Sequence, residues 1–205
     1  MMVAGLILAG GQGKRVGGVK PLLVHEGATL LERVVLNFRV ATLDPLIVVL
    51  GFEARRVIQR IPLGGLKVVI NPQPSLGISS SIQRGLAHIS PRCKAVMIAL
   101  GDMPLVTTET VNLLVAEFNK GKKGIVVPVH GKQQGHPVIF DVKYLDDLLA
   151  LRGDKGAKSV LEAHPNDVHE VKVDSDEVLI DIDTHEDWEM VKDRLELRHP
   201  MPSPA

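Results

Sequence analysis

The fold is decided by the stretch Val3-Ala-Gly-Leu-Ile-Leu-Ala-Gly-Gly-Gln-Gly-Lys-Arg-Val-Gly-Gly-Val-Lys20. Residues 3–9 form a continuous apolar run, which is typical of a strand that helices cover on both faces of a sheet. Glycines follow at once, and their backbone can come close to a ligand, so that its N–H groups contact phosphate oxygens. The stretch therefore predicts a buried strand that ends in a phosphate-binding loop.

Two cationic side chains, Arg15 and Lys20, closely follow Gly10, Gly11 and Gly13. Arg15 offers a planar fork of donors, and Lys20 offers a mobile point charge. A triphosphate requires this combination of backbone donors and positive charge. An ordinary glycine-rich turn is the structural alternative, but it does not account for the two cations. The loop therefore favours a phosphate ligand.

Two better-known phosphate loops do not fit this stretch. A dinucleotide fingerprint that starts at Gly11 needs a glycine where Val16 stands. A Walker A loop needs Ser or Thr after its lysine, whereas Lys20 is followed by Pro21. A dehydrogenase also needs an acid about twenty residues further on, and Glu53 lies about twice as far away. The loop therefore favours a nucleoside triphosphate over a nicotinamide dinucleotide.

Apolar runs alternate with helical patterns along most of the chain. Further continuous apolar runs predict buried strands over residues 46–50, 66–70, 95–100 and 124–128. Apolar residues at helical spacing predict helices around residues 31–38 and 111–118. This order predicts the α/β class, with a three-layer, mostly parallel, Rossmann-like sheet and right-handed crossovers.

The second half of the chain has a looser pattern. Glycine and proline mark loops and short segments between residues 131 and 183, and a last helix is predicted over 185–196, with Trp188, Val191 and Leu195 on one face. Three prolines in residues 199–205 predict a disordered tail. We therefore expect one domain over residues 1–198.

The composition excludes several classes of protein. The 24 basic and 24 acidic residues cancel, and aromatic residues make up 3% of the chain, so a nucleic-acid partner is not expected. A single cysteine excludes an internal disulfide and a cysteine zinc cluster. The apolar runs are too short to cross a membrane, and no basic segment with an apolar segment opens the chain. We therefore expect a cytoplasmic enzyme.

An aspartate follows the apolar run 95–100, in Gly101-Asp102-Met103-Pro104. Ligands of open α/β sheets bind beyond the carboxyl ends of the strands, so Asp102 points into the same crevice as the first loop. Magnesium prefers hard oxygen ligands and often needs only one or two carboxylates. Asp102 is therefore the first candidate for a magnesium ligand; a helix-capping role is weakened because Thr107 or Thr108 serves as the cap.

A second acidic segment reads Asp181-Ile-Asp183-Thr184-His185-Glu-Asp187. We expect Asp181 and Asp183 on one face of a strand, with Asp183 at its end. Thr184 and Asp187 resemble a capping box, so Asp183 is either a second metal ligand or only a residue that favours the start of the last helix.

Three serines, Ser79–Ser81, stand at a predicted helix N-terminus and offer hydroxyl and N–H groups to a nucleotide, although one of them would suffice as a cap. Further along, His136 is either a ligand-binding or a structural histidine, and Asp154 and Lys155 either bind a ligand or form a solvated turn.

Several of these segments resemble the MobA-like NTP transferase family, and most closely its molybdenum cofactor cytidylyltransferases. The matching segments are Leu8-Ala-Gly-Gly with Arg15 and Lys20, Asn71-Pro, Gly77-Ile-Ser-Ser-Ser-Ile82, Gly101-Asp-Met-Pro104, Gly135-His-Pro-Val138, Gly153-Asp-Lys-Gly-Ala157 and Asp181-Ile-Asp-Thr184. The sequence departs from the family pattern at Val16, where methionine is usual, and at His185, where proline is usual.

The resemblance implies a fold of the nucleotide-diphospho-sugar transferase type and a magnesium-dependent transfer of CMP from CTP to molybdenum-bound molybdopterin. It implies catalytic roles for Arg15, Lys20 and Asp102, metal binding by Asp102 and Asp183, and acceptor binding by His136, Asp154 and Lys155. The implied nucleotide-binding residues are Leu8, Ala9, Gly10, Gly11, Gly13, Arg15, Lys20, Ser79, Ser80 and Ser81. A recipient molybdoenzyme or chaperone is the implied protein partner.

One residue conflicts with the cytidylyltransferase resemblance. Guanylyl-transferring relatives typically carry glycine at the position of Gly10, and cytidylyl-transferring relatives carry alanine there. Gly10 leaves room for a purine, so GTP remains an alternative to CTP, and other phosphorylated acceptors remain alternatives to molybdopterin. A non-catalytic nucleotide-binding partner of a molybdoenzyme is the alternative of another class.

Overall fold

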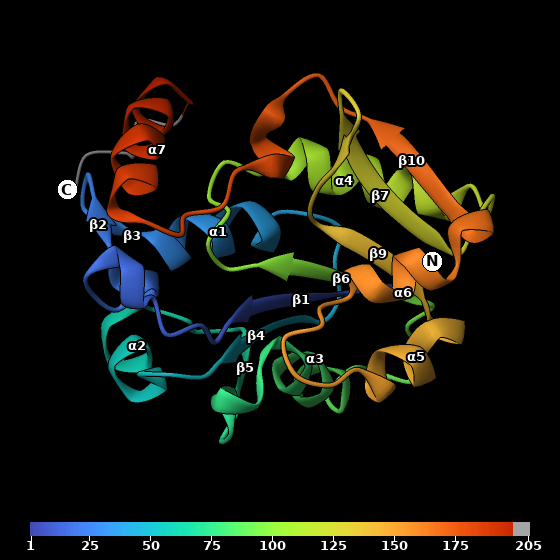
Figure 1. Ribbon diagram of the computed structural model, residues 1–205, viewed down its shortest axis with the longest axis horizontal. Coiled ribbons are helices and arrows are strands. Elements are labelled where there is room, and N and C mark those ends of the chain that lie inside the picture. The colour runs from blue at the N-terminus through green and yellow to red at the C-terminus, as the bar shows by residue number, and fades with distance from the viewer. Residues whose placement is uncertain (199–205) are drawn as a thin grey trace.

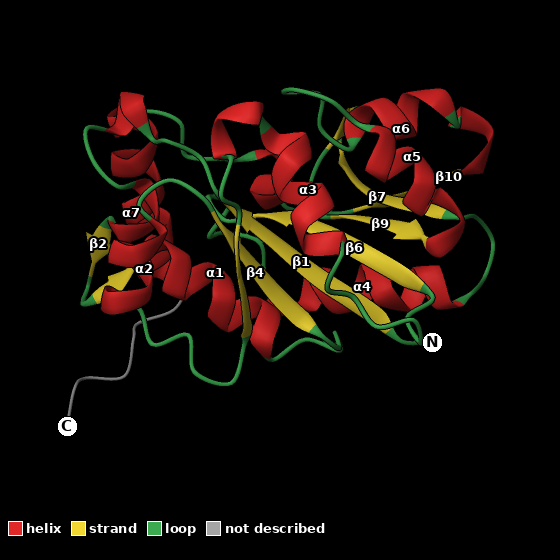
Figure 2. Ribbon diagram, turned by 90° about the horizontal axis from the view of Figure 1, so that it is seen from below, coloured by secondary structure: helices red, strands yellow, loops and turns green. Residues whose placement is uncertain are grey.

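A sheet crosses the molecule and carries helices on both of its faces (Figures 1 and 2). The computed structural model describes residues 1–198. Across the sheet the strands are β10 (Val168–Lys172), β7 (Ile125–His130), β9 (Val138–Asp141), β6 (Ala95–Leu100), β1 (Val3–Ala9), β4 (Leu46–Leu50) and β5 (Lys67–Ile70), and β8 (Gln133–Gln134) pairs with β7. The strands predicted from apolar runs are confirmed, with small shifts at their ends.

The strands depart from a parallel sheet at β8 and β9. β1 pairs in parallel with β4 and β6, β4 with β5, and β7 with β10. β9 runs antiparallel to both of its neighbours, β6 and β7, and the short β8 runs antiparallel to β7. The short connection from β7 through β8 to β9 requires this direction, because a parallel return would need a crossover of a dozen or more residues. The predicted mostly parallel sheet is therefore confirmed, with β8 and β9 as unforeseen antiparallel strands.

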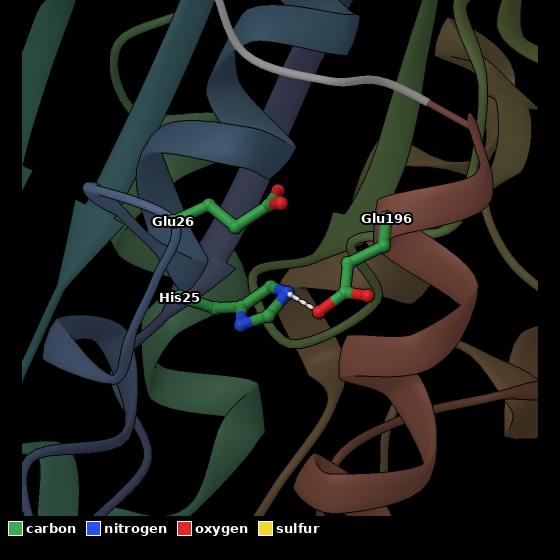
Figure 3. A group of neighbouring side chains, drawn as sticks. All are labelled: His25, Glu26 and Glu196. Carbon is green, nitrogen blue, oxygen red and sulfur yellow. Dashed lines mark ion pairs between the residues drawn. The ribbon is translucent and has the colours of Figure 1, made fainter. Parts of the chain in front are cut away.

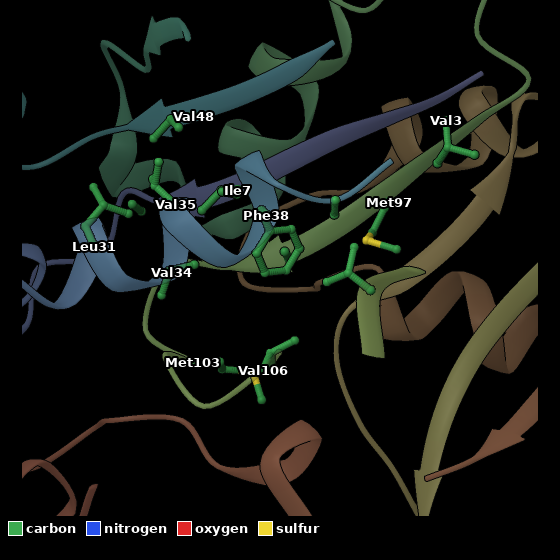
Figure 4. Close-up of a cluster of buried hydrophobic side chains, with 14 of the residues drawn as sticks. Val3, Ile7, Leu31, Val34, Val35, Phe38, Val48, Met97, Met103 and Val106 are labelled. Atoms are coloured by element: carbon green, nitrogen blue, oxygen red, sulfur yellow. The ribbon is translucent and has the colours of Figure 1, made fainter. Parts of the chain in front are cut away.

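Two layers of helices cover the sheet. The core of one face includes residues of α1 (Leu30–Arg39), α2 (Ala54–Arg60) and α4 (Thr108–Asn119), and that of the other face includes residues of α3 (Ile78–Leu86), α5 (Leu145–Ala150) and α6 (Lys158–Ala163). β1 contributes Val3 and Ile7 to the first core and Leu6 to the second. Figure 4 shows the first core, where Phe38 of α1 lies near Met97 of β6. The predicted three-layer architecture is therefore confirmed.

A smaller core holds the last helix, α7 (His185–Arg198), near the hairpin of β2 (Val24–His25) and β3 (Ala28–Thr29) (Figure 1). Trp188, Val191 and Leu195 are buried in this core, as their spacing predicted. The helix begins at His185, as predicted, and the predicted disordered tail of residues 199–205 lies outside the described part of the chain.

Threonines begin two of the helices. Thr29 and Glu32 form a capping box at α1, in which Oε2 of Glu32 accepts a hydrogen bond from N–H of Thr29 at 2.6 Å. Thr107, one of the two predicted caps, accepts a hydrogen bond from N–H of Thr110 at the start of α4.

None of the described helices has the length and apolar character of a membrane span.

Short 3-10 helices connect the larger elements. They are η1 (Lys14–Val16), η2 (Lys20–Leu22), η3 (Pro74–Leu76), η4 (Val142–Tyr144), η5 (Pro165–Asp167) and η6 (Asp176–Leu179).

The prediction of a strand that carries Asp181 and Asp183 is wrong. Residues 180–183 follow η6 and do not pair along an edge of the sheet. Instead, N–H of Ile182 donates one hydrogen bond, of 3.1 Å, to the carbonyl oxygen of Asp102. The segment crosses the end of β6, and this single bond places both aspartates near Asp102.

Candidate active site

The glycine loop after β1 folds back so that Lys20 lies beneath it. Gly13 has a φ of 60°, in the left-handed region that favours glycine. A Cβ atom at Gly13 would lie 2.8 Å from Cβ of Lys20, so a larger residue would displace the lysine. Gly11, in contrast, has no atom within 4 Å of the place where a Cβ would stand, and it lines the main cleft. The backbone of the loop at Gly11 therefore faces the cleft, and Lys20 packs against the loop at Gly13.

Lys20 joins two carboxylates that come from distant parts of the chain. Its Nζ lies 2.7 Å from Oδ2 of Asp102 and 3.2 Å from Oδ1 of Asp183. Its side chain is 12% exposed, and burial alone would lower the pKa of the amine. The two carboxylates outweigh burial and raise the pKa of Lys20 above its ordinary value, so the ammonium stays charged at neutral pH.

One carboxylate oxygen of Asp102 makes no hydrogen bond to the described part of the chain. Oδ2 accepts from Lys20, whereas Oδ1 is buried and has no hydrogen-bond partner among the described residues. A buried carboxylate oxygen without a partner is costly, so a ligand that contacts it is favoured. Asp102 is therefore well placed to bind a cation or a ligand hydroxyl.

Asp183 connects this pair to an exposed arginine. Its Oδ2 lies 2.8 Å from Nη2 of Arg15, whose side chain is 70% exposed. N–H of Asp183 donates to Oδ2 of Asp187, which also accepts from N–H of Thr184. The predicted capping pair of Thr184 and Asp187 is thus present, and the Asp183 side chain remains available for Arg15 and Lys20.

A third carboxylate, Asp181, lies close enough to the other two to be affected by their charge. Burial raises the pKa of Asp181 above its ordinary value, and the negative charges of Asp102 and Asp183 raise it further. Three acids with two cations therefore gather at the carboxyl end of the sheet, where ligands of this fold class bind.

A cleft with a volume of about 490 Å³ adjoins this cluster and has the size of a ligand pocket. It is lined by Leu8, Gly10, Gly11, Gln12, Phe52, Pro74, Ser75, Gly77, Ile78, Ser81, Leu100, Asp102 and Asp154.

Of the expected nucleotide-binding serines, Ser81 lines the cleft. Ser79 is buried beneath the helix start, and Ser80 donates to the carbonyl oxygen of Gly77 at 2.7 Å. Buried Asn71 donates hydrogen bonds to the hydroxyls of Ser80 and Ser81 and so orients both.

The three residues expected to bind the acceptor do not come together. Asp154 lines the cleft just described, because N–H of Ser79 donates to the carbonyl oxygen of Gly153 and holds that loop over the start of α3. Lys155 lines a separate outer pocket, with Asp147.

His136 lines a third cavity, with a volume of about 430 Å³, together with Lys132, Gln134, Lys158 and Glu170. Burial lowers the pKa of His136, and its Nδ1 is buried without a hydrogen-bond partner among the described residues. A fully satisfied structural histidine would have partners on both ring nitrogens, so the structural role alone does not account for His136.

Phe52 and Pro74 line the main cleft although sequence reasoning did not select them. N–H of Phe52 donates to the carbonyl oxygen of Gly10, so the turn after β4 lies against the glycine loop. The rule that directed attention to Asp102, the carboxyl end of a parallel strand, applies equally to Phe52 after β4. Phe52 could therefore have been predicted to line the cleft from its position after a parallel strand, but not from its residue type.

The chain is similar to known proteins over most of its length. The family model described as "MobA-like NTP transferase domain" matches residues 5–168. The chain is 29% identical over 191 residues to nicotine blue oxidoreductase of Paenarthrobacter nicotinovorans, covering 90% of this chain and 93% of that protein. It is 23% identical over 190 residues to molybdenum cofactor cytidylyltransferase of Escherichia coli (strain K12), covering 92% and 95%.

Among solved structures, the Rv0371c homologue from Mycobacterium sp. strain JC1 superimposes with a TM-score of 0.88 at 32% identity, covering 96% of this chain and 98% of that chain. The resemblance indicated by the motifs, and the nucleotidyltransferase fold that it implied, are confirmed.

Proposed function

Because the chain belongs to the MobA-like NTP transferase family, we propose that it transfers CMP from CTP to the phosphate of molybdenum-bound molybdopterin and releases pyrophosphate. The observation that carries the proposal is the position of Lys20 between Asp183 and Asp102, the latter of which lines the cleft. A buried lysine with two carboxylates beside a glycine loop suits a triphosphate and its counter-ion.

Magnesium fits the acidic side of this cluster. Oδ1 of Asp102 is buried and unpartnered, and Asp183 is a second carboxylate held by the same lysine. Both are hard oxygen donors of the kind that magnesium prefers. When bound there, magnesium would neutralise charge on the phosphates of the nucleotide.

The chain's own residues supply positioning and charge. A phosphate monoester is largely dianionic at neutral pH, since its second pKa is about 6, so it can attack the α-phosphorus of the nucleotide without a general base. The P–O bond to pyrophosphate breaks as the new P–O bond forms. Backbone N–H groups at Gly10 and Gly11 would hold the phosphates, and Arg15 and Lys20 would stabilise the charge on the departing pyrophosphate.

The acceptor is assigned to the cavity beside His136. Lys132 and Lys158 supply positive charge there, and the free Nδ1 of His136 supplies a hydrogen-bonding group. Molybdopterin follows from the sequence motifs and from the similarity to the cytidylyltransferase of Escherichia coli. A molybdoenzyme or chaperone would then receive the product.

GTP is the alternative nucleotide, and Gly10 favours it. A Cβ atom at Gly10 would lie 3.0 Å from Oγ of Ser81, which lines the same cleft. Glycine thus leaves the pocket wider than alanine would, and a purine needs more room than a pyrimidine.

The test is a direct assay of the purified full chain. Incubation with magnesium, molybdenum-bound molybdopterin and either CTP or GTP should release pyrophosphate and form the matching dinucleotide, detected by mass spectrometry. Binding of nucleotide without pyrophosphate release would support a non-catalytic carrier instead. Because one relative is an oxidoreductase, oxidation of NADH or NADPH is measured in parallel; such activity without nucleotidyl transfer would contradict the proposal.

A further inference from the structure

His25, at the end of β2, lies between the hairpin and the last helix (Figure 3). Its side chain is 13% exposed, and its ring meets Trp188 edge to face, with ring centroids 6.2 Å apart and planes at 86°. Trp188 itself is buried in the small core that holds α7. The His25 ring is therefore held in one orientation by packing.

Nε2 of His25 is buried and lacks a hydrogen-bond partner among the described residues. The Oε1 atom of Glu196, on α7, lies 3.4 Å from this nitrogen, as the dashed line in Figure 3 marks. A buried, unpaired ring nitrogen is costly, so an arrangement that satisfies it is favoured.

Glu26 supplies a second carboxylate at the same place. It follows His25 in the chain, and its φ of 46° belongs to the tight turn of the hairpin. One ligand atom from each of His25, Glu26 and Glu196 lies within 4.8 Å of the others, so the three enclose a common point. Imidazole nitrogen with two carboxylate oxygens is a ligand set that zinc accepts.

The separations also match zinc geometry. Zinc binds imidazole nitrogen and carboxylate oxygen at about 2.0–2.1 Å, so two ligands of a tetrahedron stand roughly 3.3 Å apart. The 3.4 Å between Nε2 of His25 and Oε1 of Glu196 agrees with that value. The two carboxylates would also balance the charge of a divalent ion.

Arg33 supports the hairpin side of the cluster. Its Nη2 donates to the carbonyl oxygen of His25 at 2.7 Å and lies 3.5 Å from Oε2 of Glu26. Carboxylates that bind metals are commonly held by such outer partners, which fix their orientation. Arg33 thus contacts one oxygen of Glu26, and a carboxylate has a second oxygen that can bind an ion.

We infer that His25, Glu26 and Glu196 bind a zinc-class divalent ion at a site separate from the one assigned to magnesium. The ion would fasten the C-terminal half of α7 to the β2–β3 hairpin. Because it binds the folded chain and not the unfolded one, it would raise the midpoint of thermal unfolding. Its ligands come from other elements than Asp102 and Asp183, so it stands independently of the proposed transferase function.

The test is a zinc titration of the tag-free full chain after removal of metals with a chelator. The titration is repeated in the Asp102→Asn, Asp183→Asn double variant, so that the cluster around Lys20 does not contribute. We expect one equivalent of zinc to bind in both proteins, with a raised unfolding midpoint and no competition from magnesium. Absence of a stoichiometric zinc site in both proteins would overturn the inference.

Glu196→Gln is the deciding variant, because Glu196 is exposed and the isosteric change should not disturb folding. We expect its zinc affinity to fall at least tenfold. The matched control is His185→Ala: Nε2 of His185 also lies 3.4 Å from a glutamate oxygen, that of Glu189, but the ring is 64% exposed and no third ligand atom lies close by among the described residues. Zinc affinity should be unchanged in His185→Ala. Equal affinities in wild type and Glu196→Gln, or an equal loss in His185→Ala, would overturn the assignment.

Discussion

Nζ of Lys20 lies 2.7 Å from Oδ2 of Asp102, although 82 positions separate the two residues in the chain. This contact joins the loop after β1 to the loop after β6, and the two strands are direct neighbours in the sheet. The lysine thus counters acidic charge at the point where the nucleotide phosphates are proposed to bind.

Lys20→Met should lower kcat by about 100-fold, because a charge that stabilises the departing pyrophosphate is removed while the apolar stem is kept. Steady-state rates of pyrophosphate release measure the effect. Lys143→Met is the matched control, since Lys143 also pairs with an aspartate, at 2.8 Å, but its partner Asp167 does not line the cleft, whereas Asp102, the partner of Lys20, does. An equal loss in both variants would contradict the role of Lys20.

Asp102→Asn should reduce turnover by roughly 1000-fold, because the buried carboxylate would no longer bind the metal ion. The unfolding midpoint should stay close to that of wild type, so the loss would not reflect misfolding. Rates measured across a magnesium titration check the prediction. Near-normal activity at any magnesium concentration would remove Asp102 from the metal site.

Gly10→Ala should shift the choice of nucleotide toward CTP. The new methyl group would meet Oγ of Ser81 at 3.0 Å, so kcat/KM for GTP should fall about tenfold further than kcat/KM for CTP. Adding Ser81→Ala removes the hydroxyl in contact and should restore part of the loss. A uniform decrease for both nucleotides would show that Gly10 does not affect the base.

Arg15→Ala should weaken nucleotide binding without changing the stability of the fold. The contact of Arg15 with Asp183 is on the surface, with the Arg15 side chain 70% exposed, so the free energy of unfolding should change by less than about 0.5 kcal/mol. The KM for the nucleotide should nevertheless rise about tenfold, because a phosphate contact is lost. Urea unfolding and initial rates together check both halves of the prediction.

Asp167 should make the protein sensitive to acid. Burial alone would raise the pKa of Asp167, but hydrogen bonds from Lys143 and Tyr144 lower it to about 2. Because the pKa in the folded state is depressed, the stabilisation is present above pH 4 and is lost as the pH falls toward 2. Asp167→Asn should therefore destabilise the fold by about 1 kcal/mol at pH 7, after allowance for partial exposure, and by much less at pH 2.5. Urea unfolding at the two pH values tests this; an equal effect at both would contradict it.

Local sequence patterns were sufficient to predict the strands and the residues that follow them. Residues 3–9 and 95–100 are buried on both faces, so continuous apolar runs identified them, and the glycine loop and Asp102 followed from chain position. The motif also placed Asp183 near Asp102, although it lies in a crossing segment and not on the predicted strand.

Long-range relations could not be predicted in the same way. The direction of β9 depends on its pairing with β6 and β7, and the sequence of a short apolar segment does not encode it. Asp154 and His136 each follow a glycine in a loop, yet in the folded chain they line different cavities. The placement of Ser80 away from the main cleft follows from its hydrogen bond to Gly77, which is visible only in the folded chain.

The antiparallel strand β9 also sets the distance between β6 and β7. It separates β6, which ends at Leu100 two residues before Asp102, from β7, whose Val127 lines the cavity of His136. Neighbouring strands lie about 4.8 Å apart, so two such spacings place the axes of β6 and β7 roughly 10 Å from one another. The separation between the proposed nucleotide site at β6 and the proposed acceptor cavity at β7 is then set by the backbone hydrogen bonds of the sheet. Loops at this edge can therefore diverge and change which molecules bind, while the spacing of the strands that carry them stays the same.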